Sequence, residues 1–275
     1  MNGPVGLELA GATYRYAGAA TAALGPIDLR VEPGRIVGVA GANESGKTTL
    51  CLVASGLAPG VAGGHLDGLA TVDGTPMGSL QPHDLAQRCG MLFQHAASQL
   101  SHTTATVFEE VAFGPCQLGL PVAEVAERVW QAMRAVGIDT LAARDPARLS
   151  GGQSQLLSLA GVLALRPRYL MLDEPTSELD PAGTALVTDA IARAARETGA
   201  GVLLVEHKTE VLARIADEVV VLERGRIVLS GRAMDVLGDP RLADLGVEPP
   251  ARTRLERRLV AAGMVLTGDL REAMR

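Results

Sequence analysis

The sequence is poor in cysteine and in aromatic residues, and each shortage excludes a class of protein. Its three cysteines, Cys51, Cys89 and Cys116, include no C-x-x-C pair, and no histidine stands near them at the spacing of a metal ligand. Neither a disulfide framework nor a zinc site is therefore expected, and we interpret them as ordinary reduced cysteines. Aromatic residues make up 3% of the chain, so its core must be built from aliphatic side chains.

An excess of positive charge and long apolar runs are also missing. The formal net charge is -6 and the isoelectric point is near 5.4, which argues against a broad nucleic-acid-binding surface. The apolar runs, such as residues 156–165, fall short of the roughly 20 residues that a membrane-spanning helix needs. The first residues lack the basic and apolar regions of a secretory signal. We therefore expect any contact with a membrane to be peripheral.

The chain does have enough hydrophobic residues, 47% of the total, to bury a full core. Short β-prone apolar runs occupy residues 35–40, 169–172 and 202–205, and a helical pattern over residues 181–198 separates the last two. Strands that alternate with helices predict β-α-β units and a parallel sheet buried on both faces. The predicted fold class is therefore α/β.

Other segments predict smaller units around this sheet. Residues 7–16 and 27–31 predict a strand-rich entrance, and the glycine-rich residues 60–78 predict surface β structure. Apolar residues recur at helical spacing over residues 122–136, and residues 219–229 predict a closing β-hairpin.

A glycine loop is the strongest motif: Gly41-Ala-Asn-Glu-Ser-Gly46-Lys47-Thr48 matches G-x4-G-K-T. It follows a β-prone run and opens a helical segment, which is the context that gives this motif its meaning. Backbone N–H groups and the helix N-terminus wrap phosphates, Lys47 adds positive charge, and the Thr48 hydroxyl ligates Mg²⁺. The alternative is a glycine turn without phosphate. The residues assigned to nucleotide binding here are Gly41, Ala42, Asn43, Glu44, Ser45, Gly46, Lys47, Thr48 and Thr49.

Two carboxylates, Asp173 and Glu174, follow the apolar run at 169–172, at the sheet edge where ligands of open parallel sheets collect. We assign Asp173 to orienting the Mg²⁺, directly or through water. We assign Glu174 to polarising the attacking water as general base. The alternative is a helix cap or turn without chemistry, and the nearby glycine loop disfavours it.

The segment Leu149-Ser150-Gly151-Gly152-Gln153 precedes these carboxylates and resembles the signature of the ATP-binding-cassette (ABC) family. The resemblance implies a P-loop NTPase ABC cassette with a mixed central sheet, an antiparallel β subdomain, an inserted helical subdomain and a small C-terminal helical appendage. It implies ATP hydrolysis as the reaction, with ATP and Mg²⁺ bound. In this family the signature of one cassette closes over ATP held by another, so a second ABC ATPase subunit, in a homodimer or heterodimer, is expected.

The resemblance also assigns residues that would be weak evidence alone. Tyr16 matches the aromatic position that stacks on adenine, Gln94 matches the Q-loop glutamine that reaches the metal, and His207 matches the switch histidine that acts with the catalytic Glu174. For an isolated tyrosine or histidine, a buried core residue is the ordinary alternative. The positions assigned to the signature and D-loop at the partner's site are Ser150, Gly151, Gly152, Gln153 and Asp180.

The predicted organisation has four parts. Residues 1–87 form the N-terminal part of the ATP-binding core with the glycine loop. Residues 88–165 hold the Q-loop and the helical signature subdomain. Residues 166–235 complete the core with the two carboxylates, the D-loop and the switch histidine. Residues 236–275 form the helical appendage, which includes a basic amphipathic stretch at 252–262.

One region resembles a particular branch of the family. The stretches Met91–Gln94, Ser98–Leu100, Thr106–Gly114 and Leu118–Pro121 are similar to the ATPases of energy-coupling-factor (ECF) transporters. These systems import vitamins, vitamin precursors, or nickel and cobalt ions with paired ATPases, a transmembrane coupling protein and a small substrate-capturing membrane protein. The resemblance implies a peripheral protein at the cytoplasmic face of the cell membrane, without a nucleic acid partner.

Three alternatives to that reading remain open. They are an ATPase of a conventional ABC importer or exporter, a soluble ABC ATPase that acts on nucleic acid, and a cassette that binds ATP without hydrolysing it.

Two positions depart from the family pattern. Glu44 stands where these loops usually carry glycine, and Ser154-Gln155-Leu156 follows the signature where a basic run is usual. A carboxylate about 4 Å from the triphosphate would cost about 4 kcal/mol at an effective dielectric constant of about 20. We therefore expect Glu44 to point away from the phosphates, to line the gap between two cassettes and to weaken ATP affinity or turnover modestly.

Overall fold

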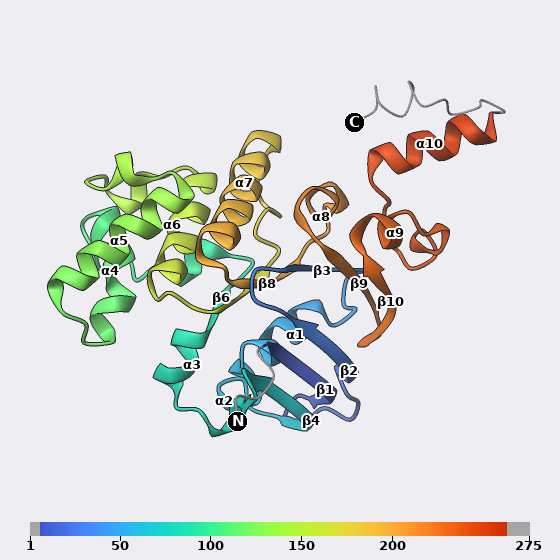
Figure 1. Cartoon of the computed structure of the whole chain (residues 1–275), viewed down its shortest axis with the longest axis horizontal. Helices are drawn as coiled ribbons and strands as arrows, with labels where there is room; N and C mark the ends of the chain where they lie inside the picture. The colour runs from blue at the N-terminus through green and yellow to red at the C-terminus, as the bar shows by residue number, and fades with distance from the viewer. Residues whose placement is uncertain (1–5, 263–275) are drawn as a thin grey trace.

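The computed structural model describes residues 6–262, which form two sheets with helices between and around them (Figure 1). The strands are β1 Leu7–Arg15, β2 Leu24–Val31, β3 Ile36–Gly41, β4 His65–Val72, β5 Thr75–Pro76, β6 Cys89–Leu92, β7 Tyr169–Asp173, β8 Gly201–Val205, β9 Glu218–Glu223 and β10 Arg226–Arg232. The α-helices are α1 Lys47–Ala54, α2 Leu57–Gly60, α3 Pro82–Arg88, α4 Val107–Gln117, α5 Val122–Val136, α6 Gly151–Ala164, α7 Pro181–Thr198, α8 Thr209–Ile215, α9 Ala233–Leu237 and α10 Ala251–Ala261. Short 3-10 turns lie at Met77–Ser79, Ala96–Gln99, Asp139–Leu141, Pro146–Arg148 and Pro240–Leu242.

The larger sheet is mixed and has the strand order β10-β9-β3-β8-β7-β6. Its strands run parallel except β10, which pairs with β9 as the predicted hairpin. Every residue of β3, β7 and β8 is buried, because the sheet is covered on both faces. The α/β prediction is confirmed, and the parallel direction brings the carboxyl ends of β3, β7 and β8 to one edge.

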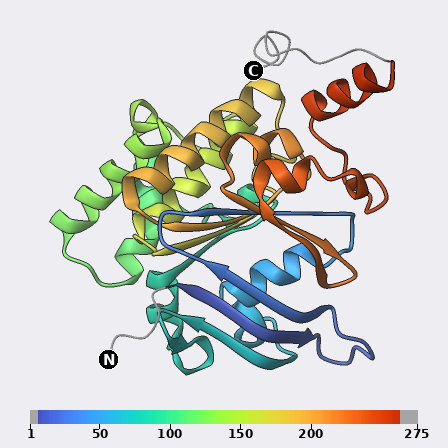
Figure 2. The same cartoon turned by 45° about the vertical axis from the view of Figure 1, so that its right-hand side comes forward.

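The smaller sheet is antiparallel, with the order β2-β1-β4-β5, and α1 lies between it and the central sheet (Figure 2). Leu50 and Val53 of α1 are fully buried in one apolar cluster with Leu9 of β1 and Leu203 of β8. The strand-rich entrance and the surface β structure at residues 60–78 are therefore parts of one layer. This layer fixes α1 and the loop that precedes it.

Helices α4, α5 and α6 pack on one another beyond the β6 edge of the central sheet (Figure 1). The start of α4 has a capping box, in which the Glu109 N–H donates to Thr106 Oγ1 and the Glu109 carboxylate accepts from the Thr106 N–H. The helix predicted at residues 122–136 is α5, and it ends at Gly137 with a φ of 77°, a conformation that glycine adopts without strain.

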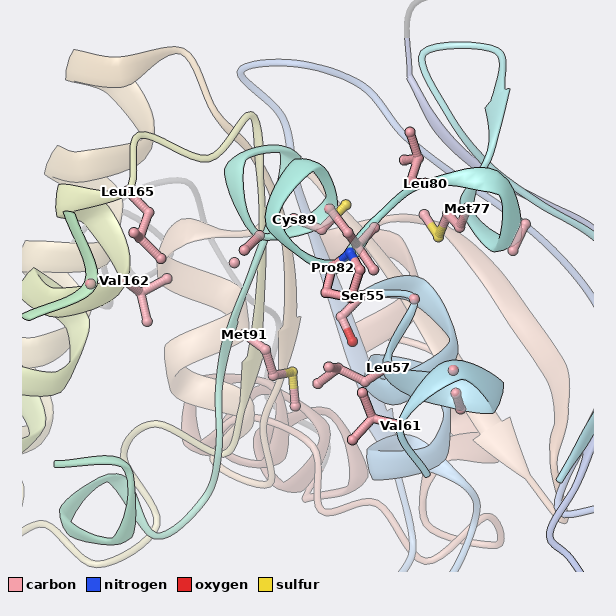
Figure 3. A pocket seen from close by; sticks show the side chains of 18 of the residues that line it. Ser55, Leu57, Val61, Met77, Leu80, Pro82, Cys89, Met91, Val162 and Leu165 are labelled. Carbon is pink, nitrogen blue, oxygen red and sulfur yellow. The ribbon is translucent and has the colours of Figure 1, made fainter. Parts of the chain in front are cut away.

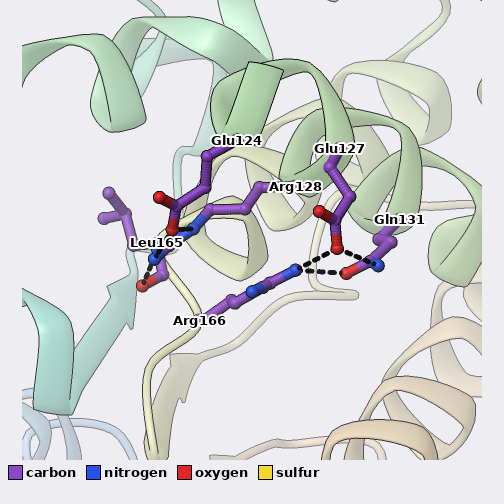
Figure 4. A network of polar contacts seen from close by, with 6 residues as sticks. All are labelled: Glu124, Glu127, Arg128, Gln131, Leu165 and Arg166. Carbon is purple, nitrogen blue, oxygen red and sulfur yellow. Dashed lines mark hydrogen bonds and ion pairs between the residues drawn. The ribbon is translucent and has the colours of Figure 1, made fainter. Parts of the chain in front are cut away.

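A polar network fastens α5 to the segment that leads from α6 into β7 (Figure 4). Arg128 donates to the Leu165 carbonyl at 3.4 Å. From the opposite direction, Arg166 donates to Glu127 at 3.1 Å and to Gln131 at 2.7 Å. The helical layer is thereby tied to the base of the central sheet.

Strand β6 pairs with β7, so we propose that the helical insertion begins after Leu92 rather than at residue 88. Helix α10 carries the predicted basic stretch and contains no buried residue. The remainder of the predicted appendage, residues 263–275, lies outside the described residues. Within residues 6–262, no helix combines the length and apolar character needed to span a membrane.

Candidate active site

The glycine loop connects the buried strand β3 to α1. Gly46 precedes α1 with a φ of 104°, and a Cβ there would lie 3.0 Å from the Ala23 carbonyl oxygen. Glycine is therefore required at this position by both conformation and space. No side chain caps the first turn of α1, so its N–H groups are left for another acceptor. Such an exposed helix start is suited to a phosphate group.

Lys47 lies inside this loop and is 5% exposed. Its Nζ donates to the Gly41 carbonyl at 3.0 Å and to the Ala42 carbonyl at 2.8 Å. Burial lowers the pKa of Lys47, and the carboxylates of Glu174 and Asp173 oppose that shift. The loop thus holds a buried amine close to two carboxylates. A phosphate could accept the hydrogen bonds that this amine now donates to the loop carbonyls.

Asp173 ends β7 beside the loop and is 2% exposed. Burial raises its pKa, and a hydrogen bond from the Thr48 side chain opposes the shift. Its Oδ1 atom is buried without a hydrogen-bond partner, as is Ser45 Oγ. Buried polar atoms normally have partners, so these two unpaired atoms are suited to binding a ligand. A carboxylate beside a threonine hydroxyl fits Mg²⁺, which one or two carboxylates and substrate phosphates usually hold.

Glu174 follows directly and is held from two sides. Its Oε2 accepts a hydrogen bond from Gln94 Nε2 at 3.0 Å, and its Oε1 lies 2.9 Å from His207 Nε2. Its N–H donates to the Val205 carbonyl at 3.0 Å, and its φ is 50°, an uncommon conformation for a residue with a side chain. Two side chains from separate segments thus meet at the Glu174 carboxylate, and the Glu174 side chain is 12% exposed.

These residues surround a cleft of about 680 Å³. The sequence-predicted residues that line it are Asn43, Glu44, Gly46, Lys47, Thr48, Thr49, Gln94, Glu174 and His207. Glu44 is exposed and has a left-handed φ of 61°. That position is compatible with a place in the gap between two cassettes, and its effect on ATP stays a prediction.

Tyr16 lies next to the loop's helix. Its hydroxyl is 3.1 Å from Thr49 Oγ1, and its ring stacks edge-on against Tyr14 with the centroids 4.9 Å apart. The ring is partly exposed, so an aromatic face is present beside the phosphate loop. Stacking of adenine on that face stays a prediction.

The signature residues form the start of α6. Ser150 and Gln153 make a reciprocal capping box, in which the Gln153 N–H donates to Ser150 Oγ at 3.3 Å and the Ser150 N–H donates to Gln153 Oε1 at 3.1 Å. A Cβ built on Gly151 would meet nothing within 4 Å among the described residues. Asp180 caps α7 by accepting from the Gly183 N–H at 2.7 Å. Within residues 6–262, neither the signature residues nor Asp180 line the cleft of their own chain.

Sequence reasoning predicted the hairpin turn at residues 223–225 but missed its contact with the glycine loop. The Gly225 N–H donates to the Ser45 carbonyl at 2.8 Å, and the Gly25 N–H donates to the Gly225 carbonyl at 2.7 Å. Arg224 of the same turn lines the cleft and adds a cation to it. The sequence predicted this turn as a hairpin, but no local signal says that it packs against a loop that lies far away along the chain.

Comparisons with known proteins identify relatives of this chain in sequence and in fold. The sequence profile of a family described as ABC transporter matches residues 24–177. The energy-coupling factor transporter ATP-binding protein EcfA2 of Caldanaerobacter subterraneus subsp. tengcongensis is 37% identical over 254 residues, which cover 91% of this chain and 87% of that protein. The solved structure of cbiO1 from Clostridium perfringens, described as part of the ABC transporter complex cbiONQ, matches with a TM-score of 0.77 and 28% identity, covering 91% of this chain and 98% of that chain.

Some relatives are much longer than this chain. An ABC transporter ATP-binding protein of Methanosarcina acetivorans is 36% identical over 247 residues, or 89% of this chain, but the match spans 40% of that protein. The match to a relative from Methanosarcina mazei spans 42% of that protein's length.

Proposed function

The chain belongs to the ABC transporter family, and we propose that it binds ATP with Mg²⁺, hydrolyses the ATP and uses the resulting change of shape to drive a membrane transporter. The observation that carries this proposal is the position of Glu174. Gln94 and His207 hold its carboxylate at the cleft, directly after Asp173 with its unpaired oxygen.

In the proposed mechanism, each residue of the cleft has a defined role. Lys47 and the N–H groups of the glycine loop bind the phosphates, and Thr48 and Asp173 hold the Mg²⁺ with the assigned ligand Gln94. When bound, Mg²⁺ neutralises the charge that develops on the phosphate oxygens. Glu174 accepts the proton of the attacking water, and His207 orients the carboxylate and contacts the γ-phosphate. Tyr16 supplies the adenine platform.

A second cassette is needed to complete this site. At the start of α6, a Cβ on Gly151 would meet nothing within 4 Å among the described residues, and one on Gly152 would come no closer than 3.8 Å to Gly183. A helix start with this much room favours an anionic partner. We assign the signature residues and Asp180 to the ATP held by the partner cassette. ATP then holds the two cassettes together, and hydrolysis releases them.

An apolar groove on the surface supports the proposal of a membrane partner (Figure 3). It has a volume of about 740 Å³ and lies between α2, α3 and β6 on one side and the C-terminal half of α6 on the other. The side chains of Leu57, Val61, Met77, Met91 and Leu165 line it, and Val61 is 78% exposed. We propose that an apolar segment of a transmembrane coupling protein occupies this groove. The chain would then lie at the cytoplasmic face of the membrane as a peripheral subunit.

Within the family, we propose the ECF type, which imports a vitamin, a vitamin precursor, or nickel or cobalt ions. The similarity to an energy-coupling factor ATPase and to a part of the cbiONQ complex supports this choice. Co-purification from the native host tests it, because an ECF system should yield a small substrate-capturing membrane protein in addition to the coupling protein. Recovery of a conventional transporter instead would replace this proposal with that alternative.

Calorimetry of the purified chain with ATP and Mg²⁺ tests the central claim. We expect saturable binding that depends on Mg²⁺, and we expect Lys47→Ala to weaken it because a buried cation is lost from the phosphate site. A wild-type chain in its native assembly that takes up no nucleotide would overturn the proposed function.

A further inference from the structure

Lysine is rare in this chain. Of the 25 lysine and arginine residues, two are lysines and 23 are arginines. One lysine is Lys47 of the glycine loop, and the other is Lys208, which directly follows the switch histidine His207. The ammonium group of each lysine donates hydrogen bonds to two or more acceptors.

Lys208 reaches back from the segment after β8 to the D-loop, residues 177–180, and to Thr176 just before it. Its Nζ donates to the Thr176 carbonyl at 2.6 Å, to the Leu179 carbonyl at 3.0 Å and to Thr184 Oγ1 at 2.8 Å. The three acceptors belong to the residue just before the D-loop, to the D-loop itself and to the first turn of α7. One ammonium group therefore closes the loop on itself and ties it to α7.

Glu206, on the other side of His207, holds the same loop from beneath. It is 1% exposed, and its Oε1 accepts from the Thr176 N–H at 3.0 Å and from Thr176 Oγ1 at 2.7 Å. Thr176 is itself fully buried. Glu206 and Lys208 thus hold the N–H and the carbonyl group of Thr176, two residues beyond Glu174.

We propose that Glu206 and Lys208 are positioning residues, which fix the D-loop to the switch-histidine segment so that Glu174 and the loop's partner-facing residues move with His207. This inference rests on the proposed function. Three consecutive residues, Glu206, His207 and Lys208, grip one continuous segment from Glu174 to Thr184. A shift of His207 on contact with a phosphate therefore reaches Asp180, which faces the partner cassette, without passing through the sheet.

The shape of lysine suits this position better than that of arginine. An ammonium group has three donors that rotate to acceptors in different directions, whereas a guanidinium group presents a rigid planar fork. The two carbonyls and one hydroxyl around Lys208 come from separate residues and do not form a planar pair. Arginine should therefore keep the charge here but lose part of the clamp.

The test is steady-state ATP hydrolysis by the purified full chain in its native assembly. We expect Lys208→Met to lower kcat roughly 10- to 100-fold, because small misplacements of reacting groups have effects of that size. KM for ATP should stay within about threefold, because Lys208 is not among the residues that line the cleft, and Lys208→Arg should recover only part of kcat. Hydrogen exchange across residues 174–184 should be faster in Lys208→Met.

Arg214→Met is the matched control, because Arg214 also ties α8 to α7, through Asp189 at 2.6 Å, but does not contact the D-loop. Its kcat should equal that of the wild type. If Lys208→Met fails to fold, Thr184→Val removes one acceptor and should lower kcat about two- to fivefold, as loss of one hydrogen bond predicts. A wild-type kcat in both variants, or in Lys208→Met alone if it folds, overturns this inference and leaves the proposed function intact. A wild-type assembly that hydrolyses no ATP overturns both.

Discussion

The carboxyl edge of the central sheet and the start of α6 carry the two halves of the proposed nucleotide site, and they differ in how much one chain completes. At the sheet edge, Lys47, Asp173 and Glu174 converge from two strands, and Gln94 and His207 hold Glu174 in place. At the start of α6, the capping box pairs the N–H groups of Ser150 and Gln153 within the same turn, while a Cβ on Gly151 would meet nothing within 4 Å among the described residues.

The two regions also differ in how many groups they contain that destabilise the folded chain. The sheet edge contains a buried lysine, a buried aspartate with an unpaired oxygen and a glutamate at positive φ. Such features destabilise a fold and persist where a ligand or a reaction needs them. The first turn of α6, residues 151–154, contains none of these, and the unpaired Nε2 of the buried Gln155 lies in the turn after it. We therefore assign this first turn to recognition and the sheet edge to chemistry.

The largest effect is expected for Glu174→Gln. Loss of the general base should lower hydrolysis roughly 100-fold or more, while ATP binding persists because Lys47 and the loop are unchanged. Turnover and calorimetric affinity, measured on the same preparation, separate the two. Undiminished turnover in the assembled complex would contradict the assignment of Glu174.

The next effect should come from Gly151→Asp at the start of α6. A carboxylate facing the partner's γ-phosphate should lower hydrolysis about tenfold or more through charge repulsion. ATP affinity of the isolated chain should not change, because the glycine loop is untouched. Gly151→Ala is the control, since a Cβ at this position meets nothing within 4 Å in its own chain.

Mixing Gly151→Asp chains with Lys47→Ala chains sharpens this experiment. In a homodimer, each variant alone has two defective sites, but the mixed dimer has one site that combines an intact loop with an intact signature. We expect the mixture to recover activity that neither variant shows alone. Absence of recovery, with dimers confirmed by mass, would argue that the two halves act within one chain.

A smaller effect concerns the buried carboxylate behind the sheet edge. Burial raises the pKa of Glu206, and hydrogen bonds from Thr176 only partly oppose this. The folded chain therefore binds that proton more tightly than the unfolded chain, and this contribution to stability is lost as the pH rises through the folded value. As the pH rises, the free energy of unfolding of the wild type should fall relative to that of Glu206→Gln. The fall should be at most about 1.4 kcal/mol for each unit by which the folded pKa of Glu206 exceeds the unfolded pKa. Urea unfolding from about pH 4 to about pH 8 measures this, and parallel curves for the two proteins would refute it.

The smallest effect is expected for Glu44→Gln in the glycine loop. Removing an exposed carboxylate that lines the cleft should raise ATP affinity or turnover about two- to threefold, the range of a weak surface interaction. Glu44→Gly tests the backbone separately, because glycine accepts the φ of 61° without strain. If both variants match the wild type in affinity and turnover, Glu44 has no role in the gap.

Several elements followed from local patterns. The run at 169–172 predicted β7 because a parallel strand buried on both faces must be continuously apolar, and the spacing over 122–136 predicted α5 with its end at Gly137. The position of the glycine loop between a strand and a helix was also predicted, because its motif is contiguous in the sequence. The clamp from Lys208 to the D-loop and the packing of the turn at Arg224 against the glycine loop were not predicted, because their partners are distant in sequence and no periodicity encodes them.

By itself, the sequence determined strands β3, β7, β8, β9 and β10 of the central sheet but not β6, and through its contiguous motifs it named the phosphate loop, the two carboxylates and the signature. Only the tertiary structure decided that Gln94 and His207 meet at Glu174, that Asp173 keeps an unpaired buried oxygen, and that Lys208 holds the D-loop. The physical reason is the range of the interactions: hydrophobic periodicity and capping act over one helical turn or strand, whereas these contacts exist only after the parallel strands bring their carboxyl ends to one edge.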